Sequence, residues 1–467
     1  MEYLIVLAAI LVAVYGAVVA RRGGLLATML LVMLAGICFS VPFFKVPIGS
    51  LPVTIDRLLL VVLVGQYLVW RWLRLADPKP WGPAEWTLAA LSAVLAFSTL
   101  RGDWRADAYQ PVAWLIVSYA MPIAIYLVAR QAQWDEGREH VLLGAIAIFG
   151  LYLAAITVAE YLQLWGALFP RYIAATAAEA GTEFVGRGRG PLLNPIGNGV
   201  MLCTCFAASL MHWPRLPRWG KLLLLAGSLL FVAAIYATLT RSVWMSGILT
   251  LAIVVGLSLP ARLRLPVLGG GLVLTVALAG VFWESILTYK RDRDLEAGKA
   301  AESAALRPVL AMIAWNMFLD RPILGCGYGQ YQRVHLEYTA DRSSGLPLEA
   351  GRGYVAHNVF LGQLTENGMV GLGLFLALGL VWGLDAWRLW SDARLPLWAR
   401  QQGLLLLTVL GVYFLNGMFH DLAIVPMANM LLFFVAGVTA GLRPLTEPWA
   451  WPLIVRRAQV TSPLPQA

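Results

Sequence analysis

The chain has 467 residues, of which 60% are apolar and 13% are charged, and its formal net charge at pH 7 is +9. Soluble domains contain roughly 45–50% apolar and about 25% charged residues, so this composition excludes a soluble globular protein. The basic residues are spread between long apolar runs and form no basic face, which argues against nucleic acid as a partner. Three of the four cysteines lie in apolar runs, which excludes a disulfide scaffold.

Apolar runs long enough to cross a membrane follow one another along the chain. Residues 3–20 have no basic segment before them, so we expect a first span there and not a cleaved signal peptide. The later runs lie near residues 25–44, 55–73, 84–100, 110–129, 140–163, 192–211, 221–239, 243–259, 265–283, 358–386, 402–419 and 424–441. The sequence therefore predicts an all-α polytopic integral membrane protein with about 12 or 13 transmembrane helices.

The loops between these runs alternate in charge, and the set richer in Lys and Arg is expected to be cytoplasmic. This rule places the long insertion outside the cytoplasm and the C-terminus inside, and strict parity places the N-terminus outside unless one early run does not span. The predicted parts are an N-terminal transmembrane bundle (1–283), a long periplasmic loop with amphipathic helices (284–357), C-terminal transmembrane helices (358–441) and a cytoplasmic tail (442–467).

Two arginine motifs lie at predicted outer ends of spans. Arg187 and Arg189 alternate with glycines before the seventh span, where they could close around an anion such as phosphate or form an ordinary solvated turn. Arg241 stands between the eighth and ninth spans with almost no loop, so its side chain must lie at the membrane interface. It could extend toward lipid headgroups or bind a lipid-linked phosphate.

The insertion contains an amphipathic pattern that begins at Arg307 and Pro308. Pro308 fits the first position of a helix, with Arg307 at its cap, and the helix should end near Asp320. The apolar face of this helix is a structural feature, whereas Arg307 is the candidate functional residue. The glycine-rich turn 325–329 follows.

His357 ends the insertion, and Asn358 after it is a good N-cap for the next span. An imidazole at the membrane interface near several arginines could accept a proton, although a lone histidine is more often structural. Glu366 lies roughly 12 Å further into the span and should pair with a buried group. Asp421 could orient a histidine or an arginine, or simply cap a helix.

No nucleotide-binding P-loop, HExxH zinc motif or GxSxG nucleophile motif occurs. The three aspartates of the insertion, Asp292, Asp294 and Asp320, each have an arginine neighbour, which favours ion pairing over a metal site. We therefore expect no metal ion and no other cofactor. Arginines with a histidine instead suggest chemistry on a phosphate-bearing substrate.

These motifs resemble the O-antigen ligase and O-antigen polymerase superfamily of bacterial envelope glycosyltransferases. The similarity covers about residues 236–376 in family order and rests on three pieces. These are the Thr-Arg-Ser-Val-Trp junction at Arg241, the helix from Arg307 with the turn 322–329, and His357-Asn358 leading to Glu366-Asn367-Gly368.

The resemblance implies a GT-C-like fold in the bacterial inner membrane, with the active site facing the periplasm. It implies an inverting, metal-independent transfer from an undecaprenyl-diphosphate-linked glycan. The acceptor would be lipid A–core in a ligase of lipopolysaccharide biosynthesis, or a second lipid-linked glycan in a polymerase. The essential histidine of the family falls on His357 and its two essential arginines on Arg241 and Arg307, while Arg187 and Arg189 correspond only loosely.

We predict an O-antigen ligase in which His357, Arg241 and Arg307 are catalytic. Arg187, Arg189, Asn358, Glu366 and Asp421 would contribute to binding the diphosphate or glycan. A polymerase is the nearest alternative. A solute or anion transporter would need polar groups at mid-membrane, and only the stretch 363–367 offers them.

Overall fold

The computed structural model describes residues 23–47, 51–75, 78–104, 110–179, 184, 186–281, 297–340 and 345–446. The predicted first span (3–20), the charged stretch 290–294 and almost all of the predicted tail 442–467 lie outside these ranges. Within the described ranges the chain is helical and contains no β-strand, apart from one isolated bridge between Val46 and Val53. The predicted all-α class is confirmed.

Each apolar run after the first corresponds to a helix. The helices of these runs are Gly23–Cys38, α2 (Ile55–Trp72), α3 (Pro83–Arg101), α4 (Pro111–Leu115) continued by α5 (Met121–Gln131), α6 (Glu136–Tyr161), α8 (Pro195–Leu210), α9 (Arg218–Ala237), α10 (Arg241–Leu251), α11 (Ala261–Val281), α15 (Val359–Ser391), α16 (Leu397–Gly417) and α17 (Pro426–Gly441). Six helices of the described chain are long and apolar enough to cross a membrane, which indicates a multi-pass membrane protein.

Helices α8, α16 and α17 form the centre of the bundle, and their side chains are buried almost throughout. Small residues allow close packing there. A Cβ added at Gly437 would lie 2.5 Å from the carbonyl oxygen of Tyr126, and one at Gly441 would lie 2.5 Å from that of Arg130. Glycine on α17 thus lets this helix contact the backbone of α5 directly, as is common between helices in membranes.

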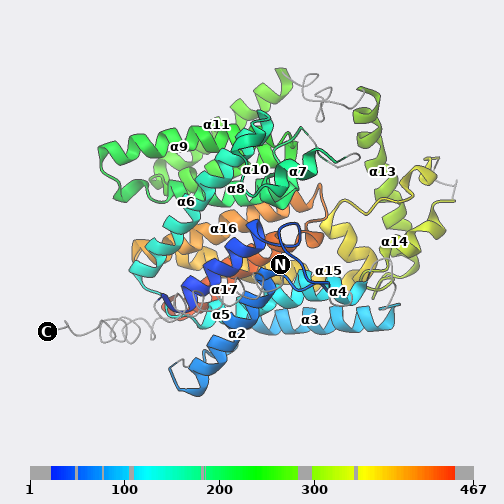
Figure 1. Ribbon diagram of the computed structural model, residues 1–467, viewed down its shortest axis with the longest axis horizontal. Helices are drawn as coiled ribbons and strands as arrows, with labels where there is room; N and C mark the ends of the chain where they lie inside the picture. The colour runs from blue at the N-terminus through cyan, green and yellow to red at the C-terminus, as the bar shows by residue number, and fades with distance from the viewer. Residues whose placement is uncertain are drawn as a thin grey trace.

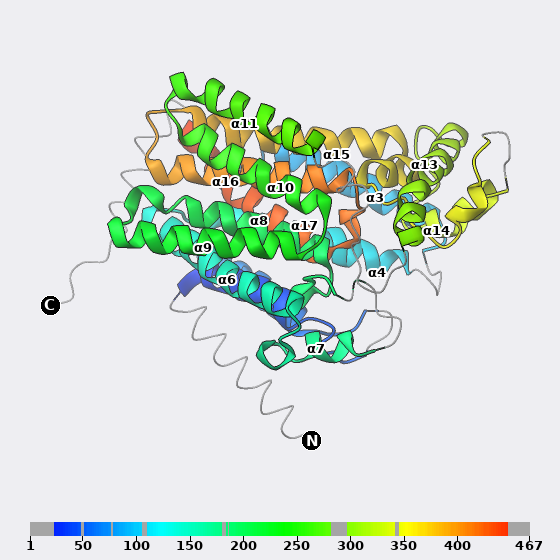
Figure 2. The same ribbon diagram turned by 90° about the horizontal axis from the view of Figure 1, so that it is seen from above.

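The insertion contributes α13 (Ala297–Asp320) and α14 (Tyr331–Val334), which lie together at one end of the bundle in both views (Figure 1, Figure 2). They enclose a small apolar core of their own, formed by Val309, Ile313, Met317, Tyr331, Val334, Leu348 and Ala356. The insertion is therefore a packed helical cap on the bundle.

The predicted end of α13 at Asp320 is confirmed, but the predicted start at Pro308 is wrong. The helix begins at Ala297, so Pro308 lies inside it and Arg307 is not a cap residue. Residues 297–306 are rich in alanine, the best helix former, and they extend the helix past the lost hydrogen bond of the proline.

Helix α15 is interrupted at Gly368, whose φ of 66° and ψ of −166° are not helical. The turn 322–329 packs into this break. The amide of Cys326 donates to the Thr365 carbonyl at 2.8 Å, and the amide of Gly327 donates to the Glu366 carbonyl at 2.9 Å. The cap is thereby joined by backbone hydrogen bonds to a membrane helix, which satisfies carbonyls that the break leaves without helical partners.

Candidate functional site

His357 is held in an uncommon backbone conformation directly before α15. Its φ is +48°, in the left-handed region that few residues other than glycine adopt. The next residue, Asn358, is the N-cap of α15, as predicted, because its side-chain oxygen accepts the amides of Phe360 at 2.8 Å and Leu361 at 3.1 Å. The imidazole is exposed at this helix start.

Arg307, on α13, lies close enough to His357 to affect its protonation. Protein atoms around the imidazole, and then the positive charge of Arg307, lower the pKa of His357 below its ordinary value of 6.5. The guanidinium of Arg307 also lies over the ring of Phe419, with its central carbon 5.5 Å from the ring centroid. Cap helix α13 and membrane helix α15 thus bring a cation and a largely neutral imidazole together.

The segment 418–425, between α16 and α17, passes beneath this pair. Asn358 donates its side-chain amide to the Met418 carbonyl at 2.9 Å. Asp421 accepts the amide of Ala423 at 3.1 Å and so caps the short turn Leu422–Ile424. Burial raises the pKa of the Asp421 carboxyl to about 6. Four predicted residues, His357, Arg307, Asn358 and Asp421, are therefore assembled around one segment.

Arg241 is the first residue of α10 and is half-buried at the junction with α9, as predicted. The neighbouring loop holds this junction in place. Arg187 donates to the Thr238 carbonyl at 3.2 Å and to the hydroxyl of Thr240 at 2.5 Å. The amide of Gly188 donates to the Ala237 carbonyl at 2.8 Å. Arg187 thus contacts the residue immediately before Arg241.

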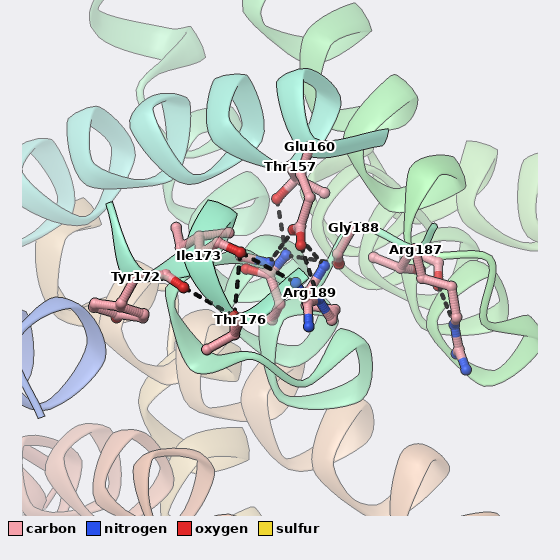
Figure 3. A network of polar contacts seen from close by, with 11 residues as sticks. Thr157, Glu160, Tyr172, Ile173, Thr176, Arg187, Gly188 and Arg189 are labelled. Carbon is pink, nitrogen blue, oxygen red and sulfur yellow. Dashed lines mark hydrogen bonds and ion pairs between the residues drawn. The ribbon is translucent and has the colours of Figure 1, made fainter. Parts of the chain in front are cut away.

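Arg189 forms a buried ion pair with Glu160 of α6, with Nε and Oε1 2.9 Å apart (Figure 3). The other carboxylate oxygen of Glu160 accepts the amides of Arg189 at 2.7 Å and Gly190 at 2.8 Å. Figure 3 also shows that Arg187 lies apart from this ion pair. Arg187 and Arg189 are only 3% and 1% exposed, so they do not form a solvated turn.

The Arg241 junction and the segment 418–425 are linked through the end of α16. Asn416 donates to the hydroxyl of Ser246, on the second turn of α10, at 2.7 Å. A Cβ added at Gly197, near the start of α8, would lie 3.0 Å from Val425. The starts of α8, α10 and α15 and the end of α16 therefore surround one region at the same end of the bundle as the cap.

Glu366 has a separate position, in the break of α15. Its carboxylate accepts the amide of Tyr331 at 3.2 Å, and Ser98 of α3 donates to its backbone carbonyl at 3.2 Å. This matches the expectation that Glu366 pairs with a buried group. Its contacts are with the cap and α3, so it anchors the cap to the bundle.

The polar stretch 363–367 also makes internal contacts. Gln363 donates to the hydroxyl of Tyr119 at 2.6 Å, and Asn367 donates to the Gln363 side-chain oxygen at 3.0 Å. Sequence reasoning did not identify Glu160, Tyr119 or Ser98. The sequence does point to Glu160, because a carboxylate at the end of a predicted span needs a buried partner.

No three His, Cys, Asp or Glu side chains among the described residues lie close enough together to hold a metal ion. The segment 418–425 brings together one guanidinium (Arg307), one imidazole and one carboxyl, and the second guanidinium within reach of the surface, that of Arg241, lies at the α9–α10 junction. Guanidiniums bind phosphate oxygens well, and a neutral imidazole accepts a proton. This set of groups can bind a phosphate ester and deprotonate a hydroxyl beside it.

Comparison with protein families agrees with this chemistry. Residues 226–376 match a family model described as O-antigen ligase. The matched segment contains Arg241, Arg307, His357, Asn358 and Glu366 and leaves the other three predicted site residues outside. The match supports the O-antigen ligase and polymerase superfamily, and with it an O-antigen ligase-type glycosyltransferase activity that uses lipid-linked glycans. A search of curated proteins finds no match.

Proposed function

We propose that this protein is an inverting, metal-independent glycosyltransferase of the bacterial inner membrane. It transfers a glycan from undecaprenyl diphosphate to a hydroxyl of lipid A–core at the periplasmic face, as an O-antigen ligase does. The observation that carries the proposal is that Arg307 and the His357-Asn358 step both contact the segment 418–425, through Phe419 and the Met418 carbonyl, with all three residues inside the O-antigen ligase match.

His357 accepts the proton of the acceptor hydroxyl in the proposed reaction. The hydroxyl oxygen attacks the anomeric carbon, the carbon–oxygen bond to the diphosphate breaks, and the diphosphate leaves on its lipid. The lowered pKa of His357 supports this role, because the imidazole is then neutral at physiological pH. The free energy comes from the glycosyl–phosphate bond of the donor.

Arg307 and Arg241 bind the diphosphate and offset the charge that grows on it as it leaves. Both reach the molecular surface, as a substrate-binding cation must. Arg187 and Arg189 have protein partners for their guanidiniums, so we assign them positioning roles: Arg187 acts through Thr240 on Arg241. Asn358 and Asp421 position His357 and the segment 418–425 in the same way.

A reconstituted assay tests the proposal. Purified protein is supplied with an undecaprenyl-diphosphate glycan and lipid A–core in EDTA, beside the variant His357→Ala. We expect transfer to lipid A–core by the wild type and a loss of at least about 100-fold in the variant, the usual contribution of a general base.

A second assay omits lipid A–core. Growth of the glycan on the donor lipid alone would replace the ligase assignment with a polymerase. Absence of both products, with intact substrates and a folded protein, would contradict glycosyl transfer and revive the transporter alternative.

A further inference from the structure

Helix α13 carries apolar residues on two opposite faces. One face, which includes Ile313 and Met317, belongs to the core of the cap. The short turn Leu348–Gly351 packs on this face, because a Cβ added at Gly351 would lie 2.6 Å from the Cδ1 atom of Ile313. This side of α13 is therefore covered by the rest of the cap.

The opposite face carries Trp315 and Leu319, which lie about one helical turn apart and are 48% and 56% exposed. The turn after α13 adds Ile323, which is 61% exposed. We call these three residues the α13 stripe. An exposed apolar surface of this kind marks a contact with another protein or with a membrane.

The depth of Ile323 follows from its contact with α15. The amide of Met369 donates to the Pro322 carbonyl at 2.8 Å, and the amide of Val370 donates to the Ile323 carbonyl at 3.3 Å. The roughly 20 residues from Met369 to Arg388, in the last turn of α15, rise by about 30 Å, which is the thickness of the hydrocarbon core of a bilayer. With Arg388 at one boundary of this core, Ile323 lies at the other.

Helix α3 gives the same depth independently. It runs over 19 residues, Pro83–Arg101, and is apolar enough to cross a membrane. At its end, Arg101 donates to the carbonyls of Leu324 at 3.0 Å and Gly325 at 2.7 Å. Two separate spans thus end beside the turn that follows α13.

Helix α13 runs crosswise to α3 and α15 at the end of the bundle in both views (Figure 1, Figure 2). A helix in this orientation lies along a membrane surface and can insert one apolar face between the headgroups and the lipid chains. Tryptophan, as at Trp315, is typical of this depth. The exposed guanidinium of Arg321, two residues before Ile323, suits the phosphate groups of lipid headgroups.

We propose that the α13 stripe is inserted into the lipid bilayer and anchors the cap to it. The partner of this surface is membrane lipid, and the stripe continues the lipid-facing surface of α15. This inference goes beyond the proposed function and rests on the fold. Because α13 also carries Arg307, the anchor would fix the height of that guanidinium above the lipid chains.

Spin labelling tests the depth of the α13 stripe. Protein without its four native cysteines is labelled at Leu319→Cys in lipid nanodiscs. The accessibility of the nitroxide to oxygen, which concentrates among lipid chains, is compared with its accessibility to a water-soluble nickel chelate. Leu229→Cys, on the exposed face of α9, is the lipid reference, and Glu349→Cys, in the turn on the opposite face of α13, is the water reference.

We expect Leu319→Cys to favour oxygen over the chelate, as Leu229→Cys does. A label at Leu319→Cys that behaves like the label at Glu349→Cys would overturn the proposal. So would spin–spin broadening that disappears on dilution with unlabelled protein, because a second copy of the chain would then cover the stripe.

A charge in the α13 stripe provides the second test. Leu319→Glu should release α13 from the lipid and speed protease digestion of the cap at least about tenfold in nanodiscs, because digestion follows the population of the open form. Leu336→Glu is the matched control, since Leu336 is another exposed leucine of the cap and lies outside the stripe, and it should be digested like the wild type. Equal acceleration in both variants, or none in Leu319→Glu, would contradict the anchor. The spin-label result decides the question if Leu319→Glu does not fold.

Discussion

Burial divides the arginines of the candidate site into two groups. The guanidinium of Arg307 is exposed and that of Arg241 is half-buried, whereas Arg187 and Arg189 are almost completely buried. A cation that binds a substrate must be reachable, and a buried cation needs a compensating partner. Glu160 compensates Arg189, and two oxygen acceptors satisfy Arg187. The two groups should therefore respond differently to substitution.

The pH dependence of transfer should report on His357. The protein atoms around the imidazole and the positive charge of Arg307 lower its pKa, so transfer should hold its rate near neutral pH and fall as the pH drops through a pKa below 6.5. In Arg307→Gln the positive charge is gone, so the pKa of His357 should rise and the acidic limb, the part of the profile where the rate falls with falling pH, should shift to higher pH. The maximal rate should also be lower. A pH–rate profile of both proteins measures this shift.

Arg333→Gln is the control for that profile, because Arg333 forms an exposed ion pair with Asp103. Its acidic limb should coincide with that of the wild type. An unshifted limb in Arg307→Gln would show that Arg307 does not act on the base.

Removal of either partner of the buried pair Arg189–Glu160 should destabilise the protein. Arg189→Met leaves the Glu160 carboxylate buried without its cation, which typically costs about 3–5 kcal/mol. The double variant Arg189→Met/Glu160→Gln removes both charges, and it should be more stable than Arg189→Met alone. Thermal unfolding in detergent measures both variants beside the wild type. A double variant no more stable than Arg189→Met would contradict a stabilising charge pairing.

At the scale of elements, the break in α15 depends on one glycine. Gly368 has φ of +66°, and an added Cβ would lie 2.2 Å from the Ile323 carbonyl oxygen. Gly368→Ala should therefore force the turn 322–329 out of the break. We expect a lower melting temperature and faster proteolysis of the cap segment, measured by limited digestion and mass spectrometry.

Gly373→Ala provides the contrast on the same helix. Nothing lies within 4 Å of its added Cβ, so alanine should stabilise the helix by up to about 1 kcal/mol. Similar proteolysis of Gly368→Ala and the wild type would mean that the turn does not depend on this break.

The helices and their caps could be predicted from the sequence where the hydropathy or the capping residue of a short segment determines them. A long apolar run predicts a span, and Asn358 before such a run predicts a cap. The pairing of Arg189 with Glu160 could not be predicted, because these residues are 29 positions apart and meet only when α6 packs on α8. The start of α13 was predicted too late in the chain, because a proline is common at the first position of a helix. The alanine-rich stretch before Pro308 is itself helical and carries the helix back to Ala297.

At the scale of the whole molecule, the position of the cap determines on which side of the membrane the proposed transfer takes place. Helices α13 and α14, the start of α15 and the segment 418–425 lie at one end of the bundle (Figure 1). The turn between α15 and α16, which contains Arg394, lies at the far end of the long helix α15. If α15 crosses the membrane, these two regions are on opposite sides, and the positive-inside rule predicts that the cap lies outside the cytoplasm.

Cysteine labelling in cells tests this orientation. Cys38, Cys203, Cys205 and Cys326 are first replaced by alanine, and one cysteine is then introduced at Glu349 in the cap or at Arg394. A membrane-impermeant maleimide should label Glu349→Cys in cells with a permeable outer membrane and should reach Arg394→Cys only after lysis. The reverse pattern would place Arg307 and His357 in the cytoplasm, where a donor presented at the periplasmic face could not reach them.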